Sequence, residues 1–577
     1  MPLSFSKINS LLKQPAPAAV VPVRIAVLAD FAPQLLATAL RGHCRHASME
    51  ADVYEGAFGA IEQEVLDSNS GLYAFAPEVV LIAYSAEALR LHFYGLDAAA
   101  QAQFSETFLA KIEGLCSALR ASLPGVQVVV MNLVELPDAV YGQYGHRAPR
   151  SFLRHTRLVN AGLTALATRL GVDVCDAALG QAMLGREAWS HPATRLQASM
   201  PFSPAATLWL AEALTAGIAA RKGHVRKCLV ADLDNTLWGG VIGDDGLAGI
   251  ELGSHGLGRA FTELQHWMLQ LKERGIVLAV CSKNSPDVAR EPFLKHPDMV
   301  LKLDDIAVFV ANWETKVDNI LFIRDTLNIG LDAMVFLDDN PFEREMVQSQ
   351  LPAVCVPDLP DDPAAYLEYL QGLYLFETAG ITAEDADRTR LYQEAAAAGE
   401  VARQYADEGS FLQSLEMQVR VMPFDEFTRP RVAQLSQRSN QWNLRTVRYT
   451  EDEVAAIAAD PTRYGLAFEL SDRLSRHGII AVVVLQEKGH ELFIENWMMS
   501  CRVLKRGMEA FILNELVALA KSLSVEELSG EYLPTAKNAL VANHYRDMGF
   551  MESNGRWRLA VAGFEPRQTF INRVPQA

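Results

Sequence analysis

A short apolar run that leads directly into two acidic residues is the feature of this 577-residue chain that most constrains its fold. Leu229 to Ala231 has the composition of a buried strand, and Asp232 and Asp234 follow it two positions apart. Residues i and i+2 of a strand lie on the same side, so the two carboxylates can face one site. In a parallel sheet, ligands bind beyond the carboxyl ends of the strands. The pattern therefore predicts a polar site at the end of this strand.

Paired carboxylates at a strand end can carry out phosphoryl transfer. One carboxylate can attack a phosphoryl group as a nucleophile. The other can protonate the leaving oxygen and later activate water. A hard cation with oxygen ligands, such as Mg²⁺, offsets the charge between carboxylate and phosphate. Two acidic residues at this spacing are by themselves more often a helix cap or a solvated turn, so this interpretation needs support from other residues.

Three further positions supply the remaining groups. A second apolar strand ends in Ser282, whose hydroxyl can bind a phosphate oxygen, and Lys316 begins a helix-like stretch and can neutralise the phosphate. A third apolar strand ends in Asp338 and Asp339, which add acidic ligands for a metal. Taken singly, Ser282 would be a helix cap and Lys316 a surface charge. Their order along the chain favours the catalytic interpretation.

This order resembles that of the haloacid dehalogenase (HAD) superfamily of phosphotransferases, over the segment from Cys228 to about Val356. The resemblance implies that Asp232 is the nucleophile and Asp234 the general acid/base. It also implies phosphate contacts and Mg²⁺ ligands at the positions that match the family's motifs. The implied phosphate contacts are Thr236, Ser282 and Lys316, and the implied metal ligands are Asp232, Asp234, Asp338 and Asp339.

The spacing of these motifs leaves no room for a large cap domain. Ser282 follows Asp232 by 50 positions, which are filled by one helix and by a hairpin predicted at Val241–Leu252 with an Asp245-Gly246 turn. Small-molecule enzymes of the superfamily commonly carry a cap that excludes water. We therefore expect an open site: either the substrate is macromolecular, or another domain of this chain closes over the site.

Longer motifs resemble a narrower group, the FkbH-like proteins, over roughly residues 224–550. In the HAD-like segment these motifs are Asp232-Leu-Asp-Asn-Thr-Leu-Trp-Gly-Gly240, Ser282-Lys-Asn284, Asn312-Trp-Glu-Thr-Lys316 and Phe336-Leu-Asp-Asp-Asn-Pro-Phe-Glu-Arg344. In the last third of the chain they are Gln437-Arg-Ser-Asn-Gln-Trp-Asn-Leu444, Ser500-Cys-Arg-Val-Leu504 and Gly530-Glu-Tyr-Leu-Pro-Thr-Ala-Lys-Asn538.

The FkbH-like resemblance implies a Mg²⁺-dependent enzyme that handles a phosphorylated three-carbon acid. The best-known members take 1,3-bisphosphoglycerate, remove phosphate, and load a glyceryl unit as a thioester onto an acyl carrier protein for polyketide assembly. The long phosphopantetheine arm of a carrier protein suits an uncapped site. Two alternatives stay open. The chain could be a simple phosphatase whose last third is a relic, or a non-catalytic assembly-line protein that docks carrier proteins.

The block from Met417 to the end resembles the GNAT acyltransferase fold. A strand at Glu491–Met499, a loop to Gly507 and a following helix are similar to the acyl-CoA pyrophosphate loop of that fold. Backbone N–H groups at such a helix start can cradle phosphate. Leu504 and Glu509 depart from the usual motif of that loop, so we expect a pantetheine arm there rather than acetyl-CoA.

Cys501 is the candidate acyl-carrying thiol. A thioester product requires a thiol nucleophile, and this cysteine stands beside the loop suited to a pantetheine arm. The alternative is a small buried residue. Cys228 and Cys281 are expected in the core. The chain has seven cysteines, an odd number, and no CxxC pair, so it has neither the pattern of a disulfide framework nor that of a zinc site, and a reducing cytoplasm fits.

The first block of the chain resembles the SGNH-hydrolase-like region that precedes some FkbH-like domains. Its strand-end nucleophile is missing, because Val27-Leu-Ala-Asp-Phe31 has no serine. Met200-Pro-Phe-Ser-Pro204 stands where that family has Asp-x-x-His. We therefore expect a non-hydrolytic binding or docking domain.

The predicted fold class is α/β multidomain, with an SGNH-like α/β domain, a capless HAD-type Rossmannoid domain and a GNAT-like α+β domain. Strands at Val23–Leu28, Val79–Ile82 and Val126–Met131 alternate with helices and predict a parallel sheet in the first block. The predicted boundaries are 1–222 for the first domain, 223–375 for the second, 376–416 for a helical connector and 417–577 for the last domain.

Charge and hydrophobicity exclude some classes of partner. Acidic residues outnumber basic ones by 70 to 52, for a formal charge of −18, whereas proteins that hold nucleic acid usually carry the opposite sign. The apolar runs are shorter than the roughly 20 residues of a membrane span. Met1–Val23 lacks the pattern of a signal peptide. We expect a cytoplasmic protein with no nucleic-acid or membrane partner.

Overall fold

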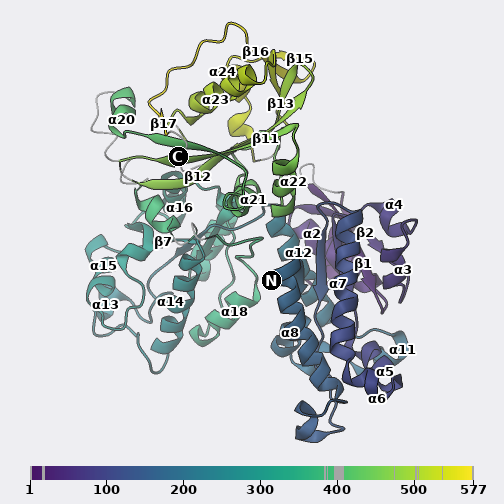
Figure 1. The fold of residues 1–577 in the computed structure, drawn as a ribbon. Helices are drawn as coiled ribbons and strands as arrows, with labels where there is room; N and C mark the ends of the chain where they lie inside the picture. The colour runs from purple at the N-terminus through teal and green to yellow at the C-terminus, as the bar shows by residue number, and fades with distance from the viewer. Residues whose placement is uncertain are drawn as a thin grey trace. The chain divides into compact units, whose positions relative to one another are not determined.

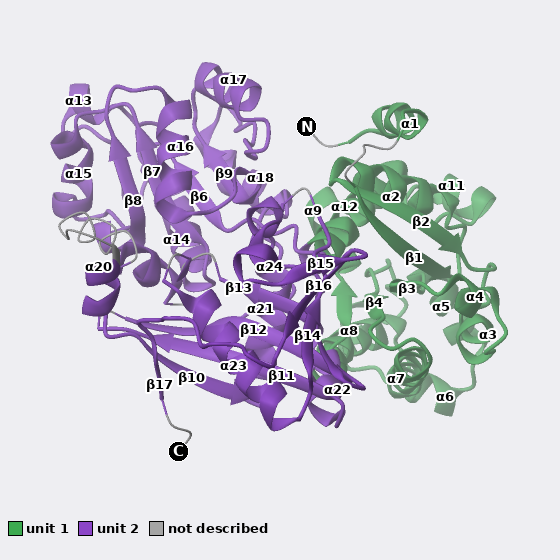
Figure 2. Ribbon diagram, turned by 90° about the horizontal axis from the view of Figure 1, so that it is seen from above, with its two compact units in different colours: residues 1–219 green, residues 220–577 purple. Residues whose placement is uncertain are grey.

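The protein folds into two compact units, Met1–Ala219 and Ala220–Ala577, that contain three β-sheets (Figures 1 and 2). The computed structural model describes residues 3–15, 20–382, 385, 387–394, 408–473, 475–500, 503–504, 506–535 and 537–574. The sheets with their flanking helices confirm the predicted α/β multidomain class. Within these described ranges, no helix combines the length and the apolar character that crossing a membrane requires.

The first unit is built on a five-stranded parallel sheet with the order β2-β1-β3-β4-β5. The three central strands confirm the predicted ones, whereas the two edge strands were not predicted. The edge strands are harder to find because one carries three acidic residues and the other is only three residues long. The strands are β1 (Val21–Ala29), β2 (Met49–Glu55), β3 (Val79–Ala83), β4 (Gln127–Met131) and β5 (Asp173–Cys175).

Helices of this unit connect successive strands and bury one continuous hydrophobic core with the sheet. Their bounds are α1 (Phe5–Lys13), α2 (Gln34–His46), α3 (Ile61–Leu66), α4 (Gly71–Phe75), α5 (Ala86–Gly95), α6 (Ala98–Ala102), α7 (Phe104–Ser122), α8 (Phe152–Leu170), α9 (Ala177–Leu184), α10 (Arg186–Trp189), α11 (Pro192–Ala198) and α12 (Pro204–Arg221).

The second unit begins with a four-stranded parallel sheet with the order β8-β7-β6-β9. Its strands are continuously apolar because helices cover both faces. Leu229 and Ala231 pack toward one face with α14 and α15, and Cys228 and Val230 pack toward the other with α16 and α17. The elements are β6 (Cys228–Ala231), α14 (Gly258–Glu273), β7 (Val277–Ser282), α15 (Pro286–Lys295), β8 (Ile306–Ala311), α16 (Lys316–Leu327), β9 (Met334–Leu337), α17 (Pro341–Gln350) and α18 (Tyr366–Gly372).

The segment Val241–Leu252 is not the predicted hairpin. A single antiparallel bridge between Gly239 and Glu251 closes the loop, and the short helix α13 (Ile242–Asp245) lies within it. Acidic side chains in the first turn of a helix stabilise its start, which explains why this sequence turns into a helix rather than a strand. Residues 233–281 are all described, and they contain no cap domain, as predicted.

The last sheet has eight strands in the order β15-β16-β14-β13-β12-β11-β10-β17 and is largely antiparallel. Helices α21 and α22 cover one face and α23 covers the other. The expected strand and helix around the Cys501 loop are confirmed as β13 and α23. The bounds are α20 (Glu408–Ser414), β10 (Gln418–Pro423), α21 (Arg429–Arg438), α22 (Glu451–Ala459), β11 (Arg463–Ser471), β12 (Arg476–Lys488), β13 (Glu491–Met499), α23 (Met508–Ser522), β14 (Glu527–Gly530), α24 (His544–Asp547), β15 (Met551–Ser553), β16 (Arg556–Ala560) and β17 (Asn572–Arg573).

The predicted connector at 376–416 lies partly outside the described residues, which resume at 408 after a gap that begins at 395. The second compact unit runs from Ala220 to Ala577 and so includes both the β6 sheet and the last sheet. The division of this unit at 375 and 416 therefore stays a prediction, as does the boundary at 222.

The domain of the third sheet contacts the amino ends of the strands of the β6 sheet. Lys227, which precedes β6, donates from Nζ to the carbonyl of Arg438 at 2.7 Å. Asp332, which precedes β9, forms an ion pair with Lys537. Arg438 and Lys537 lie in two of the FkbH-like motifs, so these motifs contribute to the junction. Asp232 is five residues beyond Lys227, about 16 Å along a strand, and lies at the opposite edge of the sheet.

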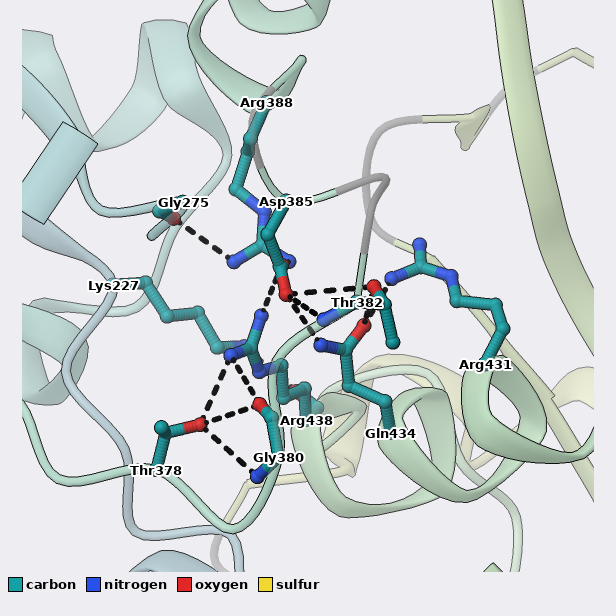
Figure 3. A network of polar contacts seen from close by, with 10 residues as sticks. All are labelled: Lys227, Gly275, Thr378, Gly380, Thr382, Asp385, Arg388, Arg431, Gln434 and Arg438. Carbon is teal, nitrogen blue, oxygen red and sulfur yellow. Dashed lines mark hydrogen bonds and ion pairs between the residues drawn. The ribbon is translucent and has the colours of Figure 1, made fainter. Parts of the chain in front are cut away.

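A buried carboxylate holds this junction together (Figure 3). Asp385 is completely buried and accepts hydrogen bonds from Arg388 at 2.5 Å, from Arg438 at 2.6 Å and from Gln434 at 2.6 Å. Arg388 also donates to the carbonyl of Gly275, just before β7, at 3.0 Å. Burial alone would raise the pKa of Asp385, but the two arginines outweigh it and hold the pKa below its usual value.

We expect Asp385→Ala to lower the free energy of unfolding by about 3–5 kcal/mol, because it leaves two guanidinium groups without their buried counter-charge. Urea unfolding followed by tryptophan fluorescence measures this effect. Asp387→Ala is the matched control: Asp387 is exposed, and its ion pair with Arg390, 3.2 Å long, should contribute at most about 1 kcal/mol. Equal effects of the two substitutions would show that the buried network does not stabilise the junction.

Candidate active site

The carboxyl ends of three neighbouring strands bring the sequence-predicted residues together. Strand β6 pairs with β7 on one side and with β9 on the other. Asp232 directly follows β6, Ser282 is the last residue of β7, and Asp338 directly follows β9. Since parallel strands end at a common edge, the three residues lie at the same end of the sheet, and the carboxylates of Asp232 and Asp338 come together although 106 positions separate them.

Lys316 is buried at the centre of this group. Its Nζ lies 2.6 Å from Oδ1 of Asp232 and 3.2 Å from Oδ2 of Asp338, and it donates to the carbonyl of Cys281 at 2.7 Å. Burial alone would lower the pKa of Lys316, but the two carboxylates outweigh it and hold the pKa above its usual value. The ammonium group therefore stays charged beside the two carboxyl groups.

Asp232, Asp338 and Asp339 each offer a carboxylate oxygen within 4.8 Å of the others. Oδ1 of Asp232 and Oδ2 of Asp338 are buried and, apart from the ion pair with Lys316, have no hydrogen-bond partner. Burial raises the pKa of Asp338 to about 7, although Lys316 opposes the rise. Buried carboxylate oxygens are stable only when donors or cations surround them. The three carboxylate oxygens together fit a hard divalent cation that prefers oxygen ligands.

Asp234 is close by, but its carboxylate is not part of that three-residue group. Its Oδ1 accepts hydrogen bonds from the indole of Trp238 at 2.9 Å and from the backbone N–H of Ile242 at 3.0 Å. Its Oδ2 accepts from the amide of Asn284 at 3.3 Å. Burial raises the pKa of Asp234 despite these bonds. The role of Asp234 as a metal ligand stays a prediction.

Thr236 and Ser282 are both buried at this edge of the sheet. The hydroxyl of Thr236 accepts a hydrogen bond from the backbone N–H of Asp339 at 3.2 Å, so it fixes the acidic loop that follows β9. This contact was not predicted from the sequence. The predicted contacts of Thr236, Ser282 and Lys316 with a phosphate group stay predictions.

Two residues inside the sequence motifs have roles that sequence reasoning missed. Asn284 binds Asp234, as described above, and Arg344 donates to the carbonyl of Asp338 at 3.0 Å and to that of Asp339 at 2.6 Å. Arg344 is buried and holds the acidic loop in place from the first helical turn after it. The signal in the sequence was their position within a few residues of the strand ends.

The cysteines divide into described and undescribed ones. Cys501, the candidate acyl carrier, and its neighbour Arg502 lie outside the described residues. Cys228 and Cys281 are buried in the core, as predicted, and burial raises the pKa of each thiol to about 12. A thiol with such a pKa is not a nucleophile near neutral pH.

The strand that leads to the Cys501 loop is already paired along its last residues. Strands β13 and β14 pair only from Glu491 to Ile494 on the β13 side. Beyond that point the segment Trp442–Leu444 lies against β13: Leu444 donates to the carbonyl of Trp497 at 3.1 Å, and Met499 donates to that of Trp442 at 3.0 Å. The chain itself therefore satisfies the backbone groups at this end of β13.

Comparison with known proteins relates the chain to a known family. Residues 24–218 match the family model described as the FkbH N-terminal domain. A solved structure, the N-terminal part of the protein BF1531 from Bacteroides fragilis, is described as containing a phosphatase domain complexed with Mg. It is 40% identical to this chain, with a TM-score of 0.63, over 66% of this chain and 100% of that one.

Two further similar structures each cover about a quarter of the chain. The ribosomal-protein-S18-alanine N-acetyltransferase from Escherichia coli is 16% identical over 26% of this chain and 98% of that one, with a TM-score of 0.21. The GNAT domain of S. lividans PAT is 17% identical over 24% of this chain and 89% of that one, with a TM-score of 0.20. No curated protein matches the chain. The match to the N-terminal domain model and the 40% identity over the whole BF1531 fragment show that the chain belongs to the FkbH family.

Proposed function

We propose that this chain is a Mg²⁺-dependent HAD-type phosphatase that dephosphorylates a phosphorylated glycerate and transfers the glyceryl unit to the thiol of an acyl carrier protein. The phosphatase part is supported by one arrangement above all: Asp232, Asp338 and Lys316 meet at the carboxyl edge of the parallel sheet. The BF1531 structure, in which a phosphatase domain binds Mg, supports the same assignment.

The proposed phosphatase reaction acts on the 3-phosphate ester and has two steps. In the first, a carboxylate oxygen of Asp232 attacks the phosphorus, the bond between phosphorus and the leaving oxygen breaks, and Asp234 gives its proton to that oxygen. In the second, Asp234 takes a proton from water, whose oxygen attacks the phosphoaspartate, so that phosphate leaves and Asp232 is restored. Lys316 balances the charge of Asp232 in both steps. Bound Mg²⁺, with Asp232, Asp338 and Asp339 as its protein ligands, would offset the charge between carboxylate and phosphate.

The phosphatase reaction leaves the 1-acyl phosphate intact as the acyl donor. In the transfer, a thiolate attacks its carbonyl carbon, the S–C bond forms, the C–O bond to phosphate breaks and inorganic phosphate leaves.

Two observations support glyceryl transfer: the open site at Asp232, and the position of the contact between the last domain and the β6 sheet. No cap covers the Asp232 edge in residues 233–281, so a carrier-bound group can enter. The last domain contacts the amino ends of the strands, at the opposite edge of the sheet. A substrate that must reach both Asp232 and the last domain would therefore need a long tether, such as the phosphopantetheine arm of a carrier protein.

A simple phosphatase is the second candidate, and one observation favours it. Trp442 and Leu444 occupy the backbone hydrogen bonds at the end of β13, so a pantetheine arm cannot pair there as an added strand. A non-catalytic docking protein is disfavoured because the whole set of phosphatase residues is present. Incubation with 1,3-bisphosphoglycerate, Mg²⁺ and a carrier protein distinguishes the three functions. Phosphate release together with a glyceryl-loaded carrier in intact-protein mass spectra supports the proposal, and phosphate release alone identifies a phosphatase.

Removal of one metal ligand should change the Mg²⁺ requirement. We expect Asp338→Ala to raise the Mg²⁺ concentration for half-maximal phosphate release on the order of 100-fold, because a carboxylate ligand contributes both charge and geometry. Titration of Mg²⁺ after exhaustive chelation measures it. Asp361→Ala, at an exposed acidic position, is the control. Full activity of the wild type after chelation would contradict the assignment of a metal-dependent site.

Substitution of the candidate thiol should separate the two activities. We expect Cys501→Ala to slow carrier loading at least tenfold, since no thiolate remains to take the acyl group, and to leave phosphate release within about threefold of wild type. Cys355→Ala, a partly buried cysteine of the same unit, controls for loss of a sulfur. If Cys501→Ala loads the carrier at the normal rate, the acyl group passes directly from the Asp232 site to the carrier thiol.

A further inference from the structure

An ion pair spans the edge of the sheet at which Asp232 lies. Lys283 is the first residue after β7, and Glu343 lies in the first turn of α17, which follows β9. Nζ of Lys283 is 2.5 Å from Oε1 of Glu343. Strands β7 and β9 flank β6 on its two sides, so they are about 10 Å apart. The pair therefore crosses the carboxyl end of β6, where Asp232 begins the active site.

The charged side chains at this edge of the sheet differ in how far they are exposed. The side chains of Lys316 and Asp338 are 2% and 0% exposed, and that of Asp232 is 13% exposed. The side chain of Lys283 is 36% exposed. Lys283 is thus the most exposed of these charged side chains, whereas Glu343, at 9%, is more buried than Asp232. A substrate that extends from Asp232 toward solvent can therefore meet Lys283.

Glu343 holds Lys283 with one oxygen and keeps the other one available. The carboxylate is only 9% exposed, and its Oε2 is buried without a hydrogen-bond partner. A buried carboxylate oxygen in this condition is costly unless a donor arrives. Lys316 already contacts two carboxylates, and Arg344 is engaged by two carbonyls and by Asp358. Lys283 is therefore a partly exposed cation, and the carboxylate it contacts has one oxygen, Oε2, that lacks a hydrogen-bond partner.

We propose that Lys283 and Glu343 form a specificity subsite for the part of the substrate that is not transferred. Nζ of Lys283 binds a second anionic group, and Oε2 of Glu343 accepts a hydrogen bond from a substrate hydroxyl. This inference rests on the proposed phosphatase function. The two contacts would select the phosphorylated glycerate of the proposed function, which carries both an anionic group and a hydroxyl, over a phosphate ester that lacks either group.

Three phosphate monoesters test the two contacts separately. 3-Phosphoglycerate has both a carboxylate and a 2-hydroxyl, glycerol 3-phosphate replaces the carboxylate with a hydroxymethyl group, and 3-phosphooxypropionate lacks the 2-hydroxyl. We expect the wild type to prefer the first by kcat/KM. Lys283→Met should reduce the enzyme's preference for 3-phosphoglycerate over glycerol 3-phosphate by about 10- to 100-fold, the range for one charge-assisted hydrogen bond. Glu343→Met should remove its preference over 3-phosphooxypropionate.

A charge swap separates substrate binding from a merely structural ion pair. Lys283→Glu combined with Glu343→Lys keeps the attraction between the two positions but removes the cation from the end of β7. If the pair is structural, the swap restores the wild-type preference; if Lys283 binds substrate, it does not. Lys295→Met is the matched control, because Lys295 pairs with Glu291 at 3.0 Å on the surface of α15.

The outcomes are distinct. A wild-type kcat/KM ratio near one, an unchanged ratio in Lys283→Met, or a ratio restored by the swap overturns the subsite while the phosphatase function stands. Absence of phosphate release by the wild type from all three esters and from p-nitrophenyl phosphate, with Mg²⁺ present, overturns the proposed function and the subsite together. The subsite is supported if the kcat/KM ratio falls in Lys283→Met but stays at the wild-type value in Lys283→Arg. This comparison holds even if Lys283→Met folds poorly.

Discussion

Asp232→Asn should release phosphate at least about 10⁴-fold more slowly than the wild type, because the amide cannot form the phosphoaspartate that divides the reaction into two easier steps. The position of Asp232 supports this magnitude. Its carboxylate lies 2.6 Å from Nζ of Lys316. Its side chain is 13% exposed, whereas those of Lys316 and Asp338 are 2% and 0% exposed, so an incoming phosphate group reaches Asp232 first. Asparagine has nearly the same shape, so the fold should be kept.

Release of inorganic phosphate from 3-phosphoglycerate and p-nitrophenyl phosphate, at saturating Mg²⁺, measures the effect of Asp232→Asn. Rapid quenching followed by intact-protein mass spectrometry adds a second readout, since only the wild type should show the mass of a phosphorylated enzyme. Asp361→Asn, at an exposed site, is the control. If Asp232→Asn keeps more than a tenth of the wild-type rate, another residue is the nucleophile.

Lys316→Met should lower phosphate release by about 10³-fold and also destabilise the folded chain by about 3–5 kcal/mol. Methionine fills much of the same volume, so the loss is electrostatic. Without the ammonium, Asp232 and Asp338 face each other in a site whose side chains are almost fully buried. One of them must then take up a proton or leave the site, and the charge that Lys316 balances during phosphoryl transfer is no longer offset.

Mg²⁺ should distinguish the two effects of Lys316→Met. A cation that binds the folded state but not the unfolded one adds to stability by mass action. We therefore expect Mg²⁺ to restore part of the lost unfolding free energy, measured by urea denaturation, without restoring the rate. Lys295→Met, on the surface of α15, should change neither quantity. A Lys316→Met enzyme of normal stability would mean that the two carboxylates are already neutral in the absence of Mg²⁺.

The sequence by itself determined the placement of the catalytic candidates at strand ends. Strands β6, β7 and β9 are short, continuous apolar runs, and the polar residues that follow them, such as Asp232 and Asp338, stand out against them. Because parallel strands end at one edge, this local pattern is enough to predict that residues 106 positions apart lie together. The central strands of the first unit were found for the same reason.

Some edge strands and one loop could not be predicted from the local pattern of apolar and polar residues. Strands β2 and β5 lie at sheet edges; β2 mixes acidic with apolar residues and β5 has only three residues, so their sequences resemble loops. The loop at Val241–Leu252 carried the turn residues of a hairpin, but its acidic residues favoured the helical turn of α13. Strand preference depends on neighbouring strands, which a single sequence does not display.

Only the tertiary structure decided which charged groups meet. Glu343 is 60 positions from Lys283, and Asp385 is 53 positions from Arg438, yet each pair is within hydrogen-bond distance. It also decided that the last domain contacts the amino ends of the β6 sheet, on the side away from Asp232. Such contacts depend on the distance between atoms of separate elements after packing, and residue type and spacing along the chain do not contain that distance.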